Sequence, residues 1–343
     1  MLQRAKWLEV SYSFWKARLL QIAVRHGIFG ILERWRGRAA RQTEARSHKA
    51  ALDAPALAQR LKWEPRAAEL FLNALVGCGL LKKKSSRYRN TALAKAFLIP
   101  NKKYYLGDLI ELGDRGWGDW ARLEESLASG RPLKKSDFFS ADPSEVRSFI
   151  LAMQNTAVGH ADRLARVISL KGRRNLMDVG AGSAAFSLAF LKANPKLKAT
   201  LFDLPLTLEV SREFVEQAGL TRRVEYQSGD FLKDPIRGRY DTCFVSHILH
   251  GMDETNCRRL LAKIFAALEE GGMLILQDFF LDPELSRPEF AALFSLNMLL
   301  HTDGGRSYSA KEVTAWLKET GFRQVRSPKL FLPREISILI AVK

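Results

Sequence analysis

Three aspartates, Asp178, Asp203 and Asp230, each end or closely follow a short apolar run in the middle of the chain. The first run leads through Gly180 and Gly182 into an apolar helical stretch, and the second run ends at Asp203. This order predicts a βαβ unit. Glycines let a backbone pass close to a ligand, a helix N-terminus offers free N–H groups, and a strand-end carboxylate can bind ribose hydroxyls. The unit therefore predicts a site for a nucleoside-type cofactor.

The identity of that cofactor has to be decided between two classes. The glycine loop satisfies the loose dinucleotide pattern GxGxx(G/A), which keeps a nicotinamide cofactor as an alternative. Asp178, however, would crowd a pyrophosphate but could hold the amino group of a methionine moiety. Asp230 and Phe231 offer a carboxylate and an aromatic face to an adenine. Acidic ends on three consecutive strands favour S-adenosylmethionine, although any one aspartate alone could merely cap a turn.

A histidine and a further aspartate follow the next two predicted strands. The fourth strand, residues 240–249, ends at His250, and the fifth, residues 271–280, ends near Asp278. In an open α/β sheet these ends lie side by side, so Asp278 could orient the His250 ring for proton abstraction from a hydroxyl. His250 could instead cap a helix. His247 is expected to point to the opposite face and to be structural.

Composition limits the class of protein. The chain has 343 residues, 47% of them hydrophobic, which is enough for two domains. Cys78, Cys243 and Cys257 lack metal-ligand spacing, so we expect no metal site and a reducing compartment. Charged residues interrupt the start, and no apolar run approaches the ~20 residues of a membrane span. We expect a cytoplasmic protein.

The net charge of +17 is concentrated near the N-terminus. Residues 1–100 carry 20 lysines and arginines against 6 acidic residues, with the densest run from Arg34 to Lys49. Such runs bind nucleic acid or anionic lipid in some proteins and are solvated loops in most. We expect a solvated loop, with peripheral contact to an anionic membrane as the alternative.

The first half of the chain is predicted to be largely helical. Residues 5–35 have apolar side chains at helical spacing on more than one face, which predicts a dimer. Helices at 54–61 and 65–76 followed by a hairpin at 77–89 predict a winged helix. A helix from 143 to about 168 carries Met153, which could touch the donor or an aromatic substrate, or fill the core.

The ordered motifs resemble those of one family. The segments are MDVGAGSAAFSLAF, ATLFDLP, SGDFL, VSHILHGMDETNCRRLL, GGMLILQDFFL, LNMLLHTDGGRSYS and LKETGF. Over roughly residues 15–343 the chain resembles the small-molecule O-methyltransferases, which include plant caffeic acid O-methyltransferases and bacterial polyketide, hydroxyindole and carotenoid O-methyltransferases. The resemblance implies an α/β fold with a C-terminal class I methyltransferase Rossmann-like sheet behind an N-terminal helical and winged-helix dimerisation domain. The expected boundaries are 1–103, a pocket-forming helical linker at 104–170, and 171–343.

The resemblance also implies site residues, and this chain departs from the family at some of them. The implied cofactor residues are Asp178, Gly180, Gly182, Asp203, Asp230 and Phe231; the base is His250, flanked by Asp278; and the substrate wall is Met153, Met298 and Thr302. The second acid that usually flanks the base is replaced by Ser307, and Ala184 stands where glycine is common.

Methyl transfer from S-adenosylmethionine to a hydroxyl of an aromatic or polyketide-like molecule is the function expected of a homodimer with these residues. One alternative is a winged-helix DNA-binding regulator whose second domain senses a metabolite. Its recognition helix, residues 65–76, would carry only one basic residue, Arg66, so nucleic acid is an unlikely partner. Another alternative is a relative that has diverged to a non-methylating reaction.

Overall fold

The computed structural model describes residues 2–35, 52–133, 142–328 and 336–343. It forms two compact units, Met1–Gly116 and Trp117–Lys343. The basic run from Arg34 to Lys49 lies outside the described residues from position 36 onward. Among the helices that the structure does describe, none combines the length and apolarity of a membrane span.

The N-terminal unit contains a three-stranded sheet among helices. Its elements are α1 (Leu2–Arg25), α2 (Ile28–Arg34), β1 (Leu52–Asp53), α3 (Ala54–Leu61), α4 (Pro65–Gly77), β2 (Leu81–Lys84), β3 (Arg87–Asn90), α5 (Ala92–Phe97) and α6 (Gly107–Arg115). The sheet order is β1-β3-β2, with antiparallel pairing throughout. The two short helices and the hairpin are those predicted for a winged helix.

Local sequence signals explain these boundaries. Asp53 caps α3 by accepting a hydrogen bond from the backbone N–H of Ala56, and Glu64 caps α4 in the same way. Lys62 ends α3 in the left-handed region, at φ 56°. The apolar faces of these helices pack with α2 and the sheet around one core that includes Phe29, Leu57, Leu72, Leu75 and Tyr88. These caps and this core hold the hairpin of β2 and β3 in place.

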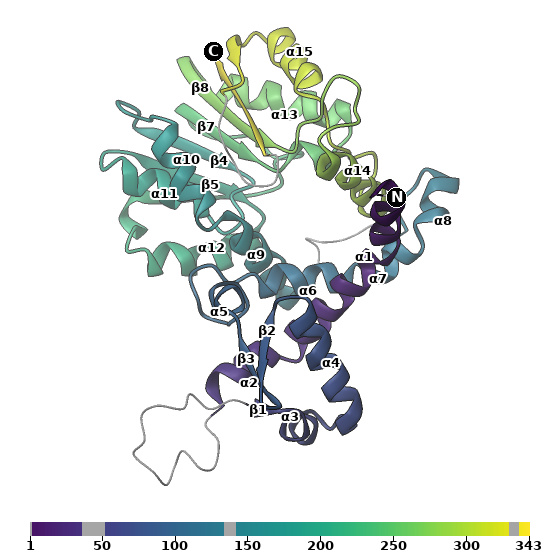
Figure 1. Cartoon of the computed structure of the whole chain (residues 1–343). Helices are drawn as coiled ribbons and strands as arrows, with labels where there is room; N and C mark the ends of the chain where they lie inside the picture. Colours follow the sequence, from purple (N-terminus) through teal and green to yellow (C-terminus); the bar gives the residue numbers. More distant parts are fainter. Residues whose placement is uncertain (1, 36–51, 134–141, 329–335) are drawn as a thin grey trace. The chain divides into compact units, whose positions relative to one another are not determined.

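The C-terminal unit is built on a seven-stranded sheet (Figure 1). Its elements are α7 (Trp117–Ala121), α8 (Leu123–Ser129), α9 (Pro143–Ala157), α10 (His160–Val167), β4 (Asn175–Val179), α11 (Ala185–Ala193), β5 (Lys198–Asp203), α12 (Pro205–Gln217), η2 (Thr221–Arg223), β6 (Val224–Ser228), β7 (Tyr240–Ser246), η3 (Leu249–Gly251), α13 (Glu254–Ala267), β8 (Leu268–Asp278), α14 (Glu289–His301), α15 (Ala310–Thr320), β9 (Arg323–Arg326) and β10 (Ser337–Val342).

The strand order explains why the chemistry-bearing residues can meet. The order is β6-β5-β4-β7-β8-β10-β9, in which β6, β5, β4, β7 and β8 are parallel and β10 is antiparallel to β8. The order reverses beside β4, so the carboxyl ends of β4 and β7 flank the switch point where ligands bind in such sheets.

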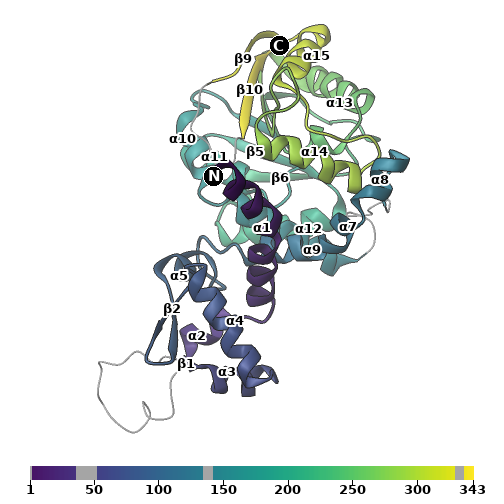
Figure 2. The ribbon, with the colours of Figure 1, turned by 45° about the vertical axis from the view of Figure 1, so that its right-hand side comes forward.

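Helices cover both faces of this sheet, as Figures 1 and 2 show. Helices α10, α11 and α12 pack with one set of alternating strand residues, which includes Leu176, Leu201 and Ile275. Helices α13 and α15 pack with the other set, which includes Val179 and Leu276. Both faces are therefore buried, as expected for parallel strands rich in aliphatic residues.

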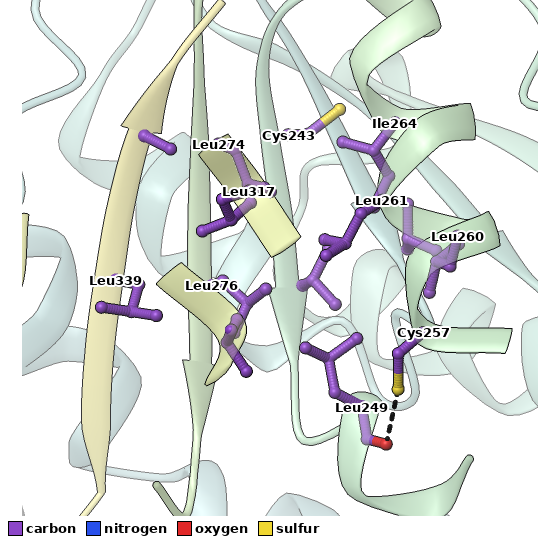
Figure 3. Packing of buried hydrophobic residues seen from close by; sticks show 14 of the residues in the cluster. Cys243, Leu249, Cys257, Leu260, Leu261, Ile264, Leu274, Leu276, Leu317 and Leu339 are labelled. Carbon is purple, nitrogen blue, oxygen red and sulfur yellow. Dashed lines mark hydrogen bonds between the residues drawn. The ribbon is translucent and has the colours of Figure 1, made fainter. Parts of the chain in front are cut away.

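The core between the sheet and helices α13 and α15 is called the second core. Figure 3 shows part of it, in which Leu260, Leu261 and Ile264 of α13 pack toward β7 and β8. Cys243 and Cys257 are buried here, and the Cys257 thiol donates to the carbonyl oxygen of Leu249. Burial raises the pKa of the Cys257 thiol to about 12, so it stays protonated. Both cysteines have the packing role that the sequence predicted.

Three predicted elements have different bounds in the structure. The fifth strand, expected at 271–280, is β8 and runs from Leu268 to Asp278. The helix expected from 143 to about 168 is two helices, because Gly159 adopts φ 80° between α9 and α10. The fourth strand ends at Ser246 instead of residue 249, and His250 lies in the 3₁₀ turn η3. In the last two cases the chain leaves the regular element where one residue takes a left-handed conformation, at Gly159 and at His247.

Candidate active site

The glycine loop after β4 approaches its neighbours closely. Gly180 has φ 72°, and a Cβ added there would overlap the end of the Ile248 side chain, with the Phe231 ring 3.8 Å away. Gly182 has φ 54°, and a Cβ there would meet no neighbour within 4 Å. The loop is therefore a backbone cradle at the switch point, and the structure brings Gly180 and Phe231 together there.

The carboxylate that ends β5 holds the glycine loop. Asp203 accepts hydrogen bonds from the backbone N–H of Gly182 at 2.9 Å and of Leu204 at 2.8 Å. Burial raises its pKa to about 6, although these two bonds act in the opposite direction. Each carboxylate oxygen can accept further bonds, so the residue fits a ribose diol as well as the loop.

Asp178 is buried in the interior of the C-terminal unit. Its Oδ2 accepts a 2.6 Å hydrogen bond from the hydroxyl of Ser187 on α11. Burial raises its pKa to about 7, and the charge of Asp203 adds to this shift. Direct contact of Asp178 with a methionine amino group stays a prediction. Ser187, which the sequence analysis did not single out, contributes its bonding partner.

Asp230 and Phe231 follow β6 at the same edge of the sheet. The Asp230 carboxylate accepts from the backbone N–H of Leu232 and pairs with Lys233 at 3.2 Å, and its side chain is 29% exposed. Phe231 packs against the second core. A partly exposed carboxylate beside an aromatic ring suits an adenine, the role the sequence predicted for this pair.

His250 and Asp278 form a hydrogen-bonded pair. The distance from His250 Nδ1 to Asp278 Oδ1 is 2.6 Å, and the backbone N–H of Phe279 donates to the same oxygen at 2.8 Å. Burial opposes ionisation of Asp278, but His250 and His247 outweigh it and hold the pKa of this carboxyl well below its usual range. An ionised Asp278 accepts the Nδ1 hydrogen of His250, which leaves Nε2 of the ring free to accept a proton.

His247 does not point to the opposite face of the sheet. Its Nδ1 lies 3.8 Å from Asp278 Oδ1, and its ring centroid lies 6.1 Å from that of His250. The residue has φ 56°, which reverses the alternation of a strand. The prediction that His247 lies away from the site was wrong for this reason.

Within the part of the chain that the structure describes, His247, His250 and Asp278 form a group that could hold a metal ion, because their ligand atoms all lie within 4.8 Å of one another. The same atoms already serve the hydrogen bond and the close contact described above.

Aromatic rings surround the histidine pair. The Phe294 ring stands edge-on to His250 at 4.8 Å between centroids, and the Phe279 ring contacts His247 at 4.4 Å. Phe290 packs against Phe279 at 5.0 Å. The sequence analysis missed these phenylalanines, although the spacing of Phe290 and Phe294 by four residues on one helix was available as a signal.

Two of the three expected substrate-wall residues lie together. Met298 lies in the last turn of α14 and Thr302 directly follows that helix, and the Thr302 hydroxyl donates to the Met298 carbonyl oxygen at 2.8 Å. A Cβ on Gly305 would overlap the Thr302 hydroxyl and the backbone of His250, so this loop packs tightly against the turn that carries His250. Met153 lies half-buried on α9.

The position expected to hold a second flanking acid contains no carboxylate. Ser307 is 1% exposed, its backbone N–H donates to the Ser295 hydroxyl, and its own hydroxyl has no partner among the described residues. Ala184 is fully buried at φ 63°, a conformation that explains why glycine is common at this position in the family it resembles.

The strand order and the position of the glycine loop are those of a class I methyltransferase. Residues 126–323 match the O-methyltransferase domain, and residues 8–100 match the O-methyltransferase dimerisation domain. The chain belongs to the O-methyltransferase family. It is thus an enzyme whose methyl donor is S-adenosylmethionine, and the dimerisation domain indicates a homodimer.

Known relatives and solved structures are similar to this chain over most of its length. A 3-hydroxy-5-methyl-1-naphthoate 3-O-methyltransferase of Streptomyces sahachiroi is 32% identical, covering 98% of this chain and 94% of the relative. A tetracenomycin polyketide synthesis 8-O-methyltransferase of Streptomyces glaucescens is 35% identical, and the match covers 82% of this chain and 85% of the relative. The structure of human N-acetylserotonin methyltransferase in complex with S-adenosylmethionine has a TM-score of 0.87 at 22% identity, covering 100% and 98%, which shows the shared fold.

Proposed function

We propose that the enzyme methylates a hydroxyl group of an aromatic or polyketide-like small molecule, with His250 as the general base and Asp278 as the group that orients it. The observation that supports this most directly is the 2.6 Å hydrogen bond between His250 Nδ1 and a buried, ionised Asp278. His250 lies on the η3 turn two residues after Ile248, whose side chain touches the glycine loop, and Asp278 ends the neighbouring strand β8. A base therefore stands beside the expected donor site.

The donor supplies a methyl group on a positively charged sulfur, and the protein must hold that carbon in line with the acceptor oxygen. Asp203 would bind the ribose, and Asp230 and Phe231 would bind the adenine. The backbone around Gly180 would pass against the donor. Most of the rate would come from this positioning, and His250 Nε2 would take the hydroxyl proton as the new bond forms.

An aromatic acceptor is supported by the rings around the base. Phe279, Phe290 and Phe294 form one packed group against the histidines. Planar rings stack or meet edge-on with such side chains. The naphthoate and tetracenomycin relatives are named for fused-ring substrates. We keep Met153, Met298 and Thr302 as proposed substrate-wall residues.

The test is methyl transfer from S-adenosylmethionine to a panel of hydroxynaphthoates and polycyclic phenols, followed by mass spectrometry. The His250→Ala variant should bind the donor nearly as well as the wild type and turn over about two to four orders of magnitude more slowly. Loss of less than threefold in turnover would reject His250 as the base. An Asp203→Ala variant should differ from His250→Ala in that its main defect is weaker donor binding, measured by calorimetry.

The proposed partner is a second copy of the chain, bound through the N-terminal unit. Helix α1 exposes Trp7 at 70%, Val10 at 55% and Trp15 at 59%, which is unusual for aromatic and branched side chains on a surface. A Trp7→Lys, Trp15→Lys double variant should sediment as a monomer. A variant that stays dimeric would place the interface elsewhere.

The other two sequence hypotheses concern basic surfaces. Helix α4 carries Arg66 as its one basic residue, and Glu69 of the same helix pairs with Lys83 on the hairpin, so the helix that would enter the DNA groove offers little positive charge. Membrane contact through Arg34–Lys49 stays a prediction because most of that run lies outside the described residues. Binding to anionic vesicles at low salt that is lost at ~0.5 M salt would support it.

A further inference from the structure

His247 adopts a conformation that its surroundings must maintain. At φ 56° it lies in the left-handed region, which costs most residues with a Cβ roughly 1–2 kcal/mol. Its backbone N–H donates to the carbonyl oxygen of Gln277 at 2.9 Å, and its ring contacts Phe279. Such a conformation persists where neighbouring contacts determine it, and these occur most often at functional sites.

A buried glutamine determines which ring nitrogen of His247 carries the hydrogen. Gln277 is fully buried, and its Oε1 lies 2.9 Å from Nε2 of His160. Its amide nitrogen donates to the Ser246 hydroxyl at 2.8 Å and lies 3.2 Å from Nε2 of His247. An amide nitrogen is only a donor, so Nε2 of His247 has to accept. The neutral ring then carries its hydrogen on Nδ1.

The reverse arrangement is disfavoured at the His247 end of this chain of hydrogen bonds. If the Gln277 amide were turned around, Nδ1 of His247 would present a lone pair to the ionised Asp278 3.8 Å away. At the other end, burial lowers the pKa of His160, and a neutral His160 ring can carry its hydrogen on Nε2 and donate it to Gln277. Hydrogen-bond donation therefore runs from His160 to Gln277 and from Gln277 to His247, and the Nδ1 hydrogen of His247 faces Asp278.

We infer that His247 is a positioning residue of the reaction, held by Gln277 with its hydrogen on Nδ1 so that a second ring N–H faces the carboxylate that orients His250. This inference rests on the proposed role of His250. It gives Asp278 a donor on the His247 side in an enzyme whose second flanking acid is replaced by Ser307. A small movement in the substrate complex would bring the 3.8 Å contact to hydrogen-bonding distance.

The kinetic test compares two substitutions at the same position. His247→Phe keeps a ring against Phe279 but removes the N–H, and should lower kcat about tenfold with the acceptor KM and the donor dissociation constant within twofold. His247→Asn places a side-chain N–H near the former Nδ1, tolerates positive φ, and should restore kcat to within about threefold of the wild type. An Asn variant no better than the Phe variant would overturn the inference.

Two further measurements keep the test independent of folding and of the base assignment. Gln277→Met leaves residue 247 unchanged and should also lower kcat. It removes the buried partner of His160 and Ser246, so a lower melting temperature is expected, and an unchanged circular dichroism spectrum at the assay temperature is the folding control. Nitrogen NMR of histidine-labelled enzyme should show His247 protonated on Nδ1, and a hydrogen on Nε2 would refute the inference. If His250→Ala instead retained its activity, the proposed base would fail while the His247 tautomer could still be measured.

Discussion

The Asp278→Asn substitution tests the base assignment most sharply, because it preserves the shape of the side chain and removes its charge. In the wild type, Asp278 Oδ1 accepts from the His250 ring at 2.6 Å and from the backbone N–H of Phe279 at 2.8 Å. An asparagine oxygen in the place of Oδ1 can accept both of these bonds. It cannot provide the negative charge that stabilises His250 as the ring gains a proton.

The size of the loss follows from that geometry. A hydrogen bond to a charged group contributes about 1.5–3 kcal/mol, which corresponds to about 10–150-fold in kcat. If the asparagine NH₂ turns toward His250, the ring must carry its hydrogen on Nε2 instead, and the base is lost. About tenfold is therefore the smallest loss that the proposed mechanism allows.

The assay is steady-state methyl transfer at saturating S-adenosylmethionine, with donor binding measured by calorimetry. The matched control is Asp241→Asn, since Asp241 accepts from the backbone N–H of Arg174 and Asn175 at the opposite end of β7. The control should keep kcat, and both variants should bind the donor within threefold of the wild type. An Asp278→Asn enzyme with more than about a tenth of wild-type kcat would refute the reasoning.

Three further predictions follow from the donor loop and from the cluster of His247, His250 and Asp278. Gly180→Ala and Gly182→Ala both place a side chain at positive φ, but only the side chain added at position 180 would overlap Ile248. The free energy of unfolding in urea should therefore fall by about 1–3 kcal/mol more for Gly180→Ala than for Gly182→Ala, and equal losses would contradict the close approach. Because burial raises the pKa of Asp178 to about 7, the folded state favours the protonated carboxyl and loses stability as the pH rises to about 7. The stability of Asp178→Asn relative to wild type should therefore increase between about pH 4 and pH 7, by at most about 1.4 kcal/mol per pH unit, and level off above pH 7; a constant difference from pH 4 to 7 would argue against the shift. Chelator treatment should leave methyl transfer unchanged, whereas a loss that a divalent metal restores would identify the histidine cluster as a metal centre.

The sequence was sufficient for elements whose signals are local. The bounds of α3 were predicted to the residue and those of α4 to within one, because Asp53 and Glu64 cap them and a proline follows each cap. The expected βαβ unit is β4, α11 and β5, since its glycines and its apolar runs are contiguous in the chain. The pairing of His250 with Asp278 was also predictable, because parallel strands bring their carboxyl ends to one edge.

The orientation of His247 could not be predicted, because alternation along a strand assumes that the strand continues. The strand stops at Ser246, and His247 turns its ring toward Asp278 under the influence of Gln277 and Phe279 from the neighbouring strand and the segment that follows it. Nothing within a few residues of position 247 specifies that turn. The contact exists only once β7 and β8 are paired.

The sequence by itself therefore determined the class of fold, the cofactor type and the residue types at the strand ends, since each depends on neighbours close along the chain. The tertiary structure decided which of those groups act together. It buried Asp178 against Ser187, and it joined His160, Gln277 and His247 to the pair of His250 and Asp278. Hydrogen-bond direction and burial depend on residues distant in sequence, and only packing brings those into contact.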